Sequence, residues 1–157
     1  MKKVFHFVFA AVMLVMGQSA MAQSEVTTVL DESFVAFTEG SEAEPATTDI
    51  SSGLTNLTGW SGRYVYEAGG MLKIGDGGNL QTARYDMKAN KGVIKISMRV
   101  RSYDESGAMF AIAVNYSTKV TDFVFDNKWH DVSYVVSGAS TSSTTYLKIT
   151  ASMALNG

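Results

Sequence analysis

Aromatic side chains with polar neighbours are the residues of this sequence best suited to contact a ligand. The chain has 2 tryptophans and 7 tyrosines among 157 residues. We single out four of them: Trp60, Tyr64, Tyr66 and Tyr103. The apolar face of a sugar ring can stack on such a side chain. Tyr64 and Tyr66 are two residues apart and would share one face of a strand. All four are therefore candidate ligand-binding residues, although large aromatics also fill the core of a small domain.

Acidic residues suggest a cation site but not a catalytic one. Asp76 lies in a glycine-rich segment, Gly75–Asn79, whose oxygens could surround a calcium ion, although an ordinary turn uses the same residue types. Hydrolysis of a glycosidic bond needs two facing carboxylates, and the adjacent Asp104 and Glu105 point apart in an extended chain. His130 has no nucleophile near it in the sequence. We therefore expect a protein that is not an enzyme.

The start of the chain has the layout of a cleavable secretory signal peptide over residues 1–22. Two lysines precede an apolar run from residue 4 to 16, and Ala20-Met21-Ala22 supplies the small residues that signal peptidase reads. The apolar run is too short for a membrane anchor, which needs about 20 residues. We expect cleavage before Gln23, no membrane span in the processed chain, and export to the periplasm, the cell surface or the medium.

Composition limits the class of partner. The formal net charge is −2 and becomes more negative once the leader lysines are removed, so the chain lacks the positive field that holds nucleic acid. There are no cysteines, which excludes disulfides and thiolate metal sites and leaves the core to burial alone. An exported domain without disulfides is more typical of a bacterial envelope than of a eukaryotic secreted protein.

Alternating apolar and polar residues predict strands with one buried face. In the segment 93–101 the inward residues would be Ile94, Ile96, Met98 and Val100. Residues 146–153 repeat the pattern. The segment 109–114 is apolar on both faces, which predicts a central strand covered on both sides.

Shorter apolar segments and turn residues complete the prediction. The further strands are expected over residues 27–34, 64–67, 71–74, 80–87, 120–125 and 132–136. Glycines predict tight turns at 67–70 and 75–79, and residues 38–52 form the longest irregular stretch. We predict an all-β fold, a two-sheet antiparallel β-sandwich in a single domain over residues 23–157. A jelly roll is the preferred form and an immunoglobulin-like sandwich is the alternative.

Several segments resemble modules of known proteins. Residues 30–34 (LDESF), followed by 57–60 (LTGW), resemble the opening of jelly-roll modules in secreted proteins of the Bacteroidetes. Residues 92–101 (GVIKISMRVR) resemble the central long strand of those modules. Residues 126–132 (DNKWHDV) are similar to a turn and strand of laminin-G-like and other concanavalin-like domains. The resemblance implies a sandwich module from residue 30 onward.

The resemblance also implies a cation site and a sheet edge. The similar modules often hold a structural calcium where Asp31 and Glu32 stand in this sequence. They usually end on one more strand, which this sequence lacks because it stops at Gly157. That strand is then supplied from elsewhere or by a longer protein, and its absence leaves an exposed edge that invites a protein partner.

These observations favour an extracellular binding module. Our first expectation is carbohydrate binding through surface aromatics, with a polysaccharide or glycan as the ligand and calcium as a possible structural cofactor. The alternative is a structural or adhesive domain of a cell-surface protein that binds a protein partner through its sheet edge.

Overall fold

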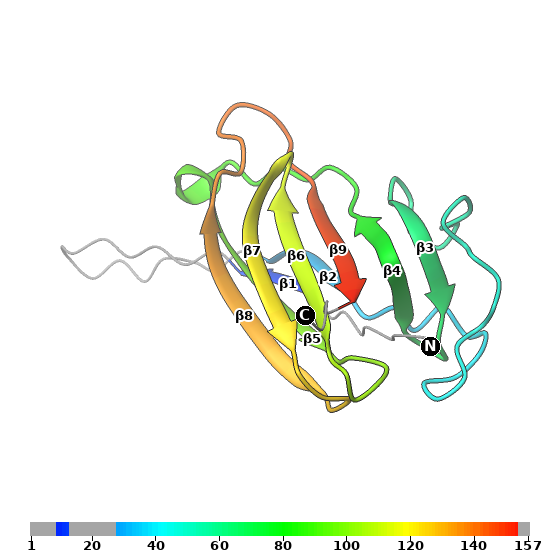
Figure 1. Ribbon diagram of the computed structural model, residues 1–157. Helices are drawn as coiled ribbons and strands as arrows, with labels where there is room; N and C mark the ends of the chain where they lie inside the picture. The colour runs from blue at the N-terminus through cyan, green and yellow to red at the C-terminus, as the bar shows by residue number, and fades with distance from the viewer. Residues whose placement is uncertain (1–8, 13–27, 154–157) are drawn as a thin grey trace.

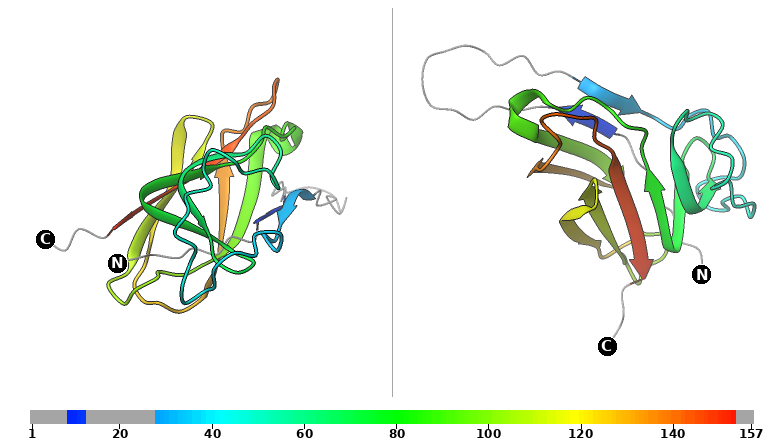
Figure 2. Two further views of the ribbon diagram at one scale, coloured as in Figure 1. Left: turned by 90° about the vertical axis from the view of Figure 1, so that its right-hand side faces the viewer. Right: turned by 90° about the horizontal axis from the view of Figure 1, so that it is seen from above.

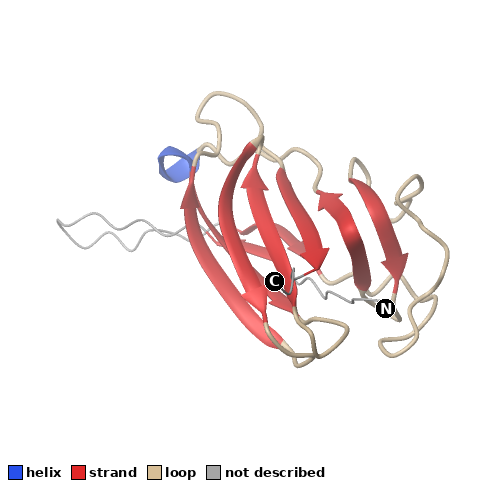
Figure 3. Ribbon diagram, viewed as in Figure 1, coloured by secondary structure: helices blue, strands red, loops and turns tan. Residues whose placement is uncertain are grey.

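Two antiparallel sheets packed face to face make up the domain (Figures 1 and 3). The computed structural model describes residues 9–12 and 28–153. Besides strands, these residues form one short 3₁₀ helix, η1 (Ala89–Gly92). Within the described residues there is no helix of the length and apolarity that crossing a membrane requires. The predicted two-sheet antiparallel β-sandwich is confirmed.

Each sheet joins segments from distant parts of the sequence. The first, called sheet A here, has the order β2 (Thr28–Glu32), β1 (Phe9–Val12), β5 (Val93–Val100) and β8 (His130–Ser137). The second, sheet B, has the order β3 (Ser61–Glu67), β4 (Leu72–Gln81), β9 (Leu147–Met153), β6 (Ala108–Val114) and β7 (Ser117–Val124). All neighbouring strands are antiparallel.

The alternating segments form strands as predicted. In β5 the four inward residues, Ile94, Ile96, Met98 and Val100, are 0–3% exposed. Their counterparts in β9 are Leu147, Ile149 and Ala151, all buried. Successive side chains point to opposite faces of a strand, so this alternation places one side of each strand in the core.

The two sides of the sandwich close in different ways. On one side, β7 lies next to β8 (Figure 1), and the Tyr134 hydroxyl of β8 donates a hydrogen bond to the Asp122 carboxylate of β7. On the other side, residues 33–60 run between β2 and β3 without regular structure. The stretch 38–52, predicted to be irregular, lies within this segment. Before and after that stretch the segment buries Phe34, Phe37 and Leu57, so it contributes side chains to the core.

The glycine-rich segment Gly75–Asn79 is not a turn, contrary to the prediction. It lies inside β4, which is one strand where two were predicted. Across the pairing with β3, Arg63 is opposite Asn79 and Val65 is opposite Ile74, so four residues of β4 face Tyr64 alone. The segment forms a large bulge. Gly77 supplies a positive φ of 66° and Gly78 allows a close backbone approach, and a turn would use glycines for the same two reasons.

The prediction that the segment 109–114 is covered on both sides is also wrong. The strand β6 is central in sheet B, and Phe110, Ile112 and Val114 are buried in the core. On the outer face, however, Met109 is 38% exposed and Ala111 is half-buried, and the described residues form no further layer above them. Apolar residues on this outer face therefore mark an open surface of the sheet.

Candidate functional site

A groove runs across the outer face of sheet B, over the ends of β4, β9, β6 and β7. We call it the sheet-B groove. It has a volume of about 320 Å³, close to the lower end of the range of about 300–1,000 Å³ for small-ligand sites. The lining residues come from all four strands, from the β6–β7 turn and from the residue that precedes β9: Gln81, Ala111, Ala113, Asn115, Tyr116, Thr118, Tyr146, Lys148 and Thr150.

Strand register explains why these residues meet. Gln81 of β4 is opposite Lys148 of β9, and Lys148 is opposite Ala113 of β6. Ala113 is in turn opposite Thr118 of β7. Partners across an antiparallel pair point to the same side, so the four side chains form one row across the sheet. The short side chain of Ala113 forms the floor of the groove, and longer polar side chains flank it on both sides.

An exposed aromatic ring stands at one end of the groove. Tyr116 is 90% exposed at the tip of the β6–β7 hairpin, next to Asn115, which has a positive φ of 54°. The Tyr116 ring meets the ring of Tyr146 edge to face, with centroids 5.7 Å apart. Asn115 is tied to the same neighbour, because its backbone N–H donates to the Tyr146 carbonyl at 3.0 Å.

Tyr146 is held in place by burial and by a neighbouring arginine. It is 4% exposed, and the Arg84 guanidinium lies 4.9 Å from its ring centre. Burial, together with the neighbouring Tyr116 phenol, raises the pKa of Tyr146 against a smaller opposing effect of Arg84. Tyr146 thus remains neutral and serves as a rigid support for the exposed ring.

Three of the four aromatic residues proposed from the sequence lie together at another place, on the outer side of β3 and β4. A Cβ built on Gly75 would be 3.3 Å from the Tyr64 Cβ and 3.3 Å from the Tyr66 ring. The Lys73 ammonium lies 4.8 Å from the centre of the Tyr66 ring and 5.8 Å from that of Tyr103. We call Tyr64, Tyr66 and Tyr103 the tyrosine cluster.

The tyrosine cluster is already engaged by the protein itself. The Arg63 guanidinium lies 4.7 Å from the centre of the Tyr64 ring, and its Nη2 donates to the Tyr64 hydroxyl at 3.0 Å. The Tyr103 hydroxyl donates to the Ala43 carbonyl at 2.6 Å. Cations therefore cover ring faces on which a ligand would have to stack.

Trp60, the fourth residue, does not join the cluster. It packs edge to face against buried Phe34, with centroids 6.0 Å apart, and its Nε1 donates to the Tyr85 hydroxyl at 3.3 Å. Trp60 thus extends the core, which was the alternative interpretation of the aromatic residues.

The residues proposed for calcium lie on different sheets. Asp31 and Glu32 belong to β2 of sheet A, whereas Asp76 lies in the bulge of β4 in sheet B. The Glu32 carboxylate accepts a hydrogen bond from the Phe34 N–H at 2.8 Å, which holds the turn after β2. Among the described residues, no three or more histidine, aspartate or glutamate side chains gather as they would around a metal ion. The two separate calcium candidates, Asp31 with Glu32 and the segment of Asp76, therefore lie apart, and neither belongs to such a cluster.

His130 takes part in the hydrogen bonds of the turn between β7 and β8. Its Nε2 lies 2.6 Å from Asp126 Oδ1, and the same oxygen accepts from the Lys128 N–H at 3.1 Å. The hydrogen bond from His130, followed by that from Lys128, lowers the pKa of Asp126. The aspartate thereby closes the turn between β7 and β8.

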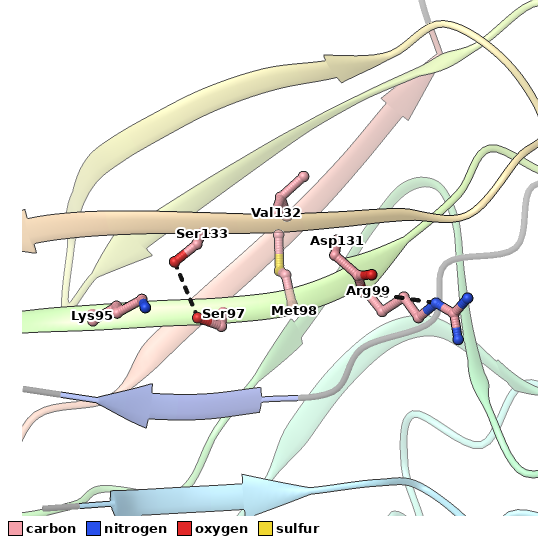
Figure 4. Close-up of a pocket in the computed structure, with 7 residues that line it drawn as sticks. All are labelled: Lys95, Ser97, Met98, Arg99, Asp131, Val132 and Ser133. Atoms are coloured by element: carbon pink, nitrogen blue, oxygen red, sulfur yellow. Dashed lines mark hydrogen bonds and ion pairs between the residues drawn. The ribbon is translucent and has the colours of Figure 1, made fainter. Parts of the chain in front are cut away.

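A second hollow, of about 330 Å³, lies on the outer face of sheet A (Figure 4). Its lining comes from β5 and β8: Lys95, Ser97, Met98, Arg99, Asp131, Val132 and Ser133. The Ser97 and Ser133 hydroxyls are 3.1 Å apart, and Arg99 Nε is 3.8 Å from Asp131. This lining contains no aromatic ring, which separates the hollow from the sheet-B groove.

The chain matches no protein-family model, and no curated protein or solved structure matches it. The function therefore has to be argued from the surfaces of the sandwich. Tyr116 was among the aromatic residues of the sequence but was not selected as a candidate, and Lys148 was missed. The available signal was the Asn115-Tyr116 pair between two strands, together with alanines at alternate positions of the preceding strand.

Proposed function

We propose that this chain is an exported, non-catalytic module that binds carbohydrate in the sheet-B groove. The observation that carries the proposal is the exposed ring of Tyr116, standing at the end of a row of polar side chains over a floor of alanine. The secretory layout of residues 1–22 supports export.

The groove has the parts that sugar recognition requires. The apolar face of a pyranose ring stacks on Tyr116, which Tyr146 holds in place. The Gln81 amide, the Lys148 ammonium and the Thr150 hydroxyl provide donors for the sugar hydroxyls. The alanine floor lets a flat ring approach the sheet closely.

The charge of the lining limits the class of sugar. Among the described residues that line the groove, Lys148 is the one that carries a charge, and none has a carboxylate. A cationic sugar would meet an uncompensated positive charge, whereas a uronic acid would meet an opposite one. The groove therefore favours neutral or anionic glycans.

A glycan array followed by affinity electrophoresis tests the proposal. The variant Tyr116→Ala should lose retention on the polysaccharides that the wild-type protein binds. Tyr64→Ala and Tyr66→Ala are the matched controls, because they remove rings from the tyrosine cluster and leave the groove intact. Weakened retention of these two controls, with Tyr116→Ala unaffected, would move the site to the tyrosine cluster. A wild-type protein that binds no glycan would refute carbohydrate binding.

The pairing of sheet A favours a second candidate function, a domain that binds a protein partner. The observation is the position of β1, whose residues belong to the expected leader and stand between β2 and β5.

A further inference from the structure

One strand of sheet A comes from the segment that export would remove. The strand β1 comprises residues 9–12, inside the leader predicted over residues 1–22. It lies between β2 and β5 and is antiparallel to both (Figure 2, right; Figure 4). Its register is defined on both sides, because Ala10 is opposite Asp31 of β2 and Ser97 of β5.

Removal of β1 leaves β2 without a strand neighbour. In the described parts of the chain, β1 is the only strand that pairs with β2. Yet β2 has its own attachment to the core, because Leu30 is 8% exposed and the following Phe34 is 1% exposed. Glu32 adds a hydrogen bond to the Phe34 N–H. We therefore expect β2 to stay in place when β1 is lost.

Direct pairing of β2 with β5 is an unfavourable way to close the gap. Both strands are antiparallel to β1, so they are parallel to each other. To pair, β2 would have to move by about 4.8 Å, one strand spacing, and pull Leu30 and Phe34 away from their packing. Parallel pairing is also slightly weaker per residue than antiparallel pairing.

We propose that loss of the leader opens a slot between β2 and β5, and that this slot binds an extended segment of a second exported protein. The proposal rests on the export included in the proposed function. The leader strand marks both the position and the direction of the bound segment, which runs antiparallel to its two neighbours. The edge of β5 then gains main-chain hydrogen-bond partners in place of unpaired groups, as in other strand-addition complexes.

The neighbouring side chains define the chemistry of the bound segment. A position opposite Ile96 lies on the core side of the sheet and requires an apolar residue. Positions opposite Ser97 and Lys95 lie on the outer side and suit polar residues. Asp31 flanks the outer side from β2, so charges of both signs border the slot. The partner segment therefore alternates apolar and uncharged polar residues.

A disulfide test can establish occupancy and register together, because the chain contains no cysteine. The protein is purified in its processed form after export, with Ser97→Cys. The probe is a synthetic peptide of residues 7–14 between lysine tails, with Ala10→Cys. We expect a mixed disulfide with Ser97→Cys, and also with Asp31→Cys on the other border of the slot. Asp122→Cys, on β7 of the other sheet, is the exposed control and should react at least tenfold more slowly.

Thermal unfolding provides an independent measurement without cysteines. The peptide of residues 7–14 should raise the Tm of the processed wild-type protein by several degrees, because it binds the folded state alone. The same peptide with Ala11→Pro, or with its sequence scrambled, should leave the Tm unchanged, since proline cannot provide a ladder donor.

Each contrary result overturns the proposal in a recognisable way. Equal reaction at Asp122→Cys, or no Tm increase, means that there is no specific slot. The amides of Ile96 and Ser97 point to opposite edges of β5. If both exchange slowly in the absence of the peptide, β2 has closed the gap. A dimer without peptide means that a second copy occupies the slot. A secreted protein whose mass still includes the leader refutes leader removal, on which the slot depends. Glycan binding would be unaffected by the first three results.

Discussion

The rings of Tyr116 and Tyr146 meet edge to face, with centroids 5.7 Å apart and planes at 88°. One ring is 90% exposed and the other is 4% exposed, so the buried ring fixes the position of the exposed one. A ring held in this way loses little conformational freedom when a ligand stacks on it. The pair gives sheet B an aromatic contact point next to its row of polar side chains.

The first prediction concerns the stacking role of Tyr116. Tyr116→Ala should weaken glycan binding by at least about 1 kcal/mol, roughly fivefold, because the ring face is lost. Tyr116→Phe should bind nearly as well as the wild-type protein, because it keeps the face and loses only the hydroxyl. Isothermal titration with the best ligand from the array measures both. Equal losses in the two variants would show that the hydroxyl, not the ring face, makes the contact.

The second prediction concerns the alanine floor. Ala113→Leu places a branched side chain in the middle of the groove and should weaken binding at least about tenfold, or about 1.4 kcal/mol. The free energy of unfolding should change by no more than about 0.5 kcal/mol, because the residue points away from the core. Ser133→Leu makes a similar change on sheet A and should leave binding intact. Unchanged affinity of Ala113→Leu would place the ligand elsewhere.

The third prediction concerns the charge of the groove. Lys148→Gln should weaken retention on a uronic-acid polysaccharide and leave retention on a neutral one unchanged, because only the ion pair is lost. Salt at 1 M should reproduce the effect in the wild-type protein. The control is Lys95→Gln, which removes a positive charge from the outer face of sheet A. If both lysine variants weaken retention equally, the attraction is a general effect of net charge.

The faces of β5 could be predicted from the sequence, whereas the groove could not. Ile94, Ile96 and Met98 alternate with polar residues, and a period of two encodes the buried face directly. The groove depends on the register of β4, β9 and β6, which brings Gln81, Lys148 and Ala113 together from distant segments. No local sequence pattern predicts which residues of these three strands lie opposite each other.

Two sequence signals were ambiguous for physical reasons. The outward alanines Ala111 and Ala113 look like core residues, since apolarity does not distinguish a covered face from an open one lined by small side chains. The glycines of 75–79 suit a turn and a bulge equally, because both need positive φ and close backbone approach. The aromatic residues of 64 and 66 were expected on one regular strand face, but the bulge gives Tyr64 a positive φ of 54°.

The fourth prediction concerns the contact between the sheets at high pH. Burial, and then the Asp122 carboxylate, raise the pKa of Tyr134 far above its ordinary value of 10.0. The folded state therefore keeps its proton while the unfolded state loses it, so this contribution to stability is complete below pH 10 and declines as the pH rises further.

Urea unfolding between pH 8 and pH 11 measures this effect. Wild-type protein should lose stability more steeply over that interval than Tyr134→Phe, which has no proton to lose at this position. Asp122→Asn keeps the phenol and removes the charge, so its slope should fall between the two. Parallel pH profiles of wild type and Tyr134→Phe would contradict the assignment.

The fifth prediction concerns the bulge that shapes β3 and β4. A Cβ on Gly78 would lie 2.7 Å from the Arg63 carbonyl oxygen and 2.8 Å from that of Gly75. Both contacts are with backbone, which cannot move aside without breaking the pairing. Gly78→Ala should therefore lower the free energy of unfolding by at least about 2 kcal/mol, as overpacking of a rigid site does.

Gly53→Ala is the matched control for this substitution, because a Cβ there meets nothing within 4 Å. It should be neutral or slightly stabilising, since alanine restricts the unfolded chain more than glycine does. Gly78→Ala should also change the environment of Tyr64, which lies opposite the bulge, and near-ultraviolet circular dichroism can detect that change. A Gly78→Ala protein as stable as Gly53→Ala would mean that the two strands are not held by the close backbone approach at residue 78, and the placement of the tyrosine cluster would need another explanation.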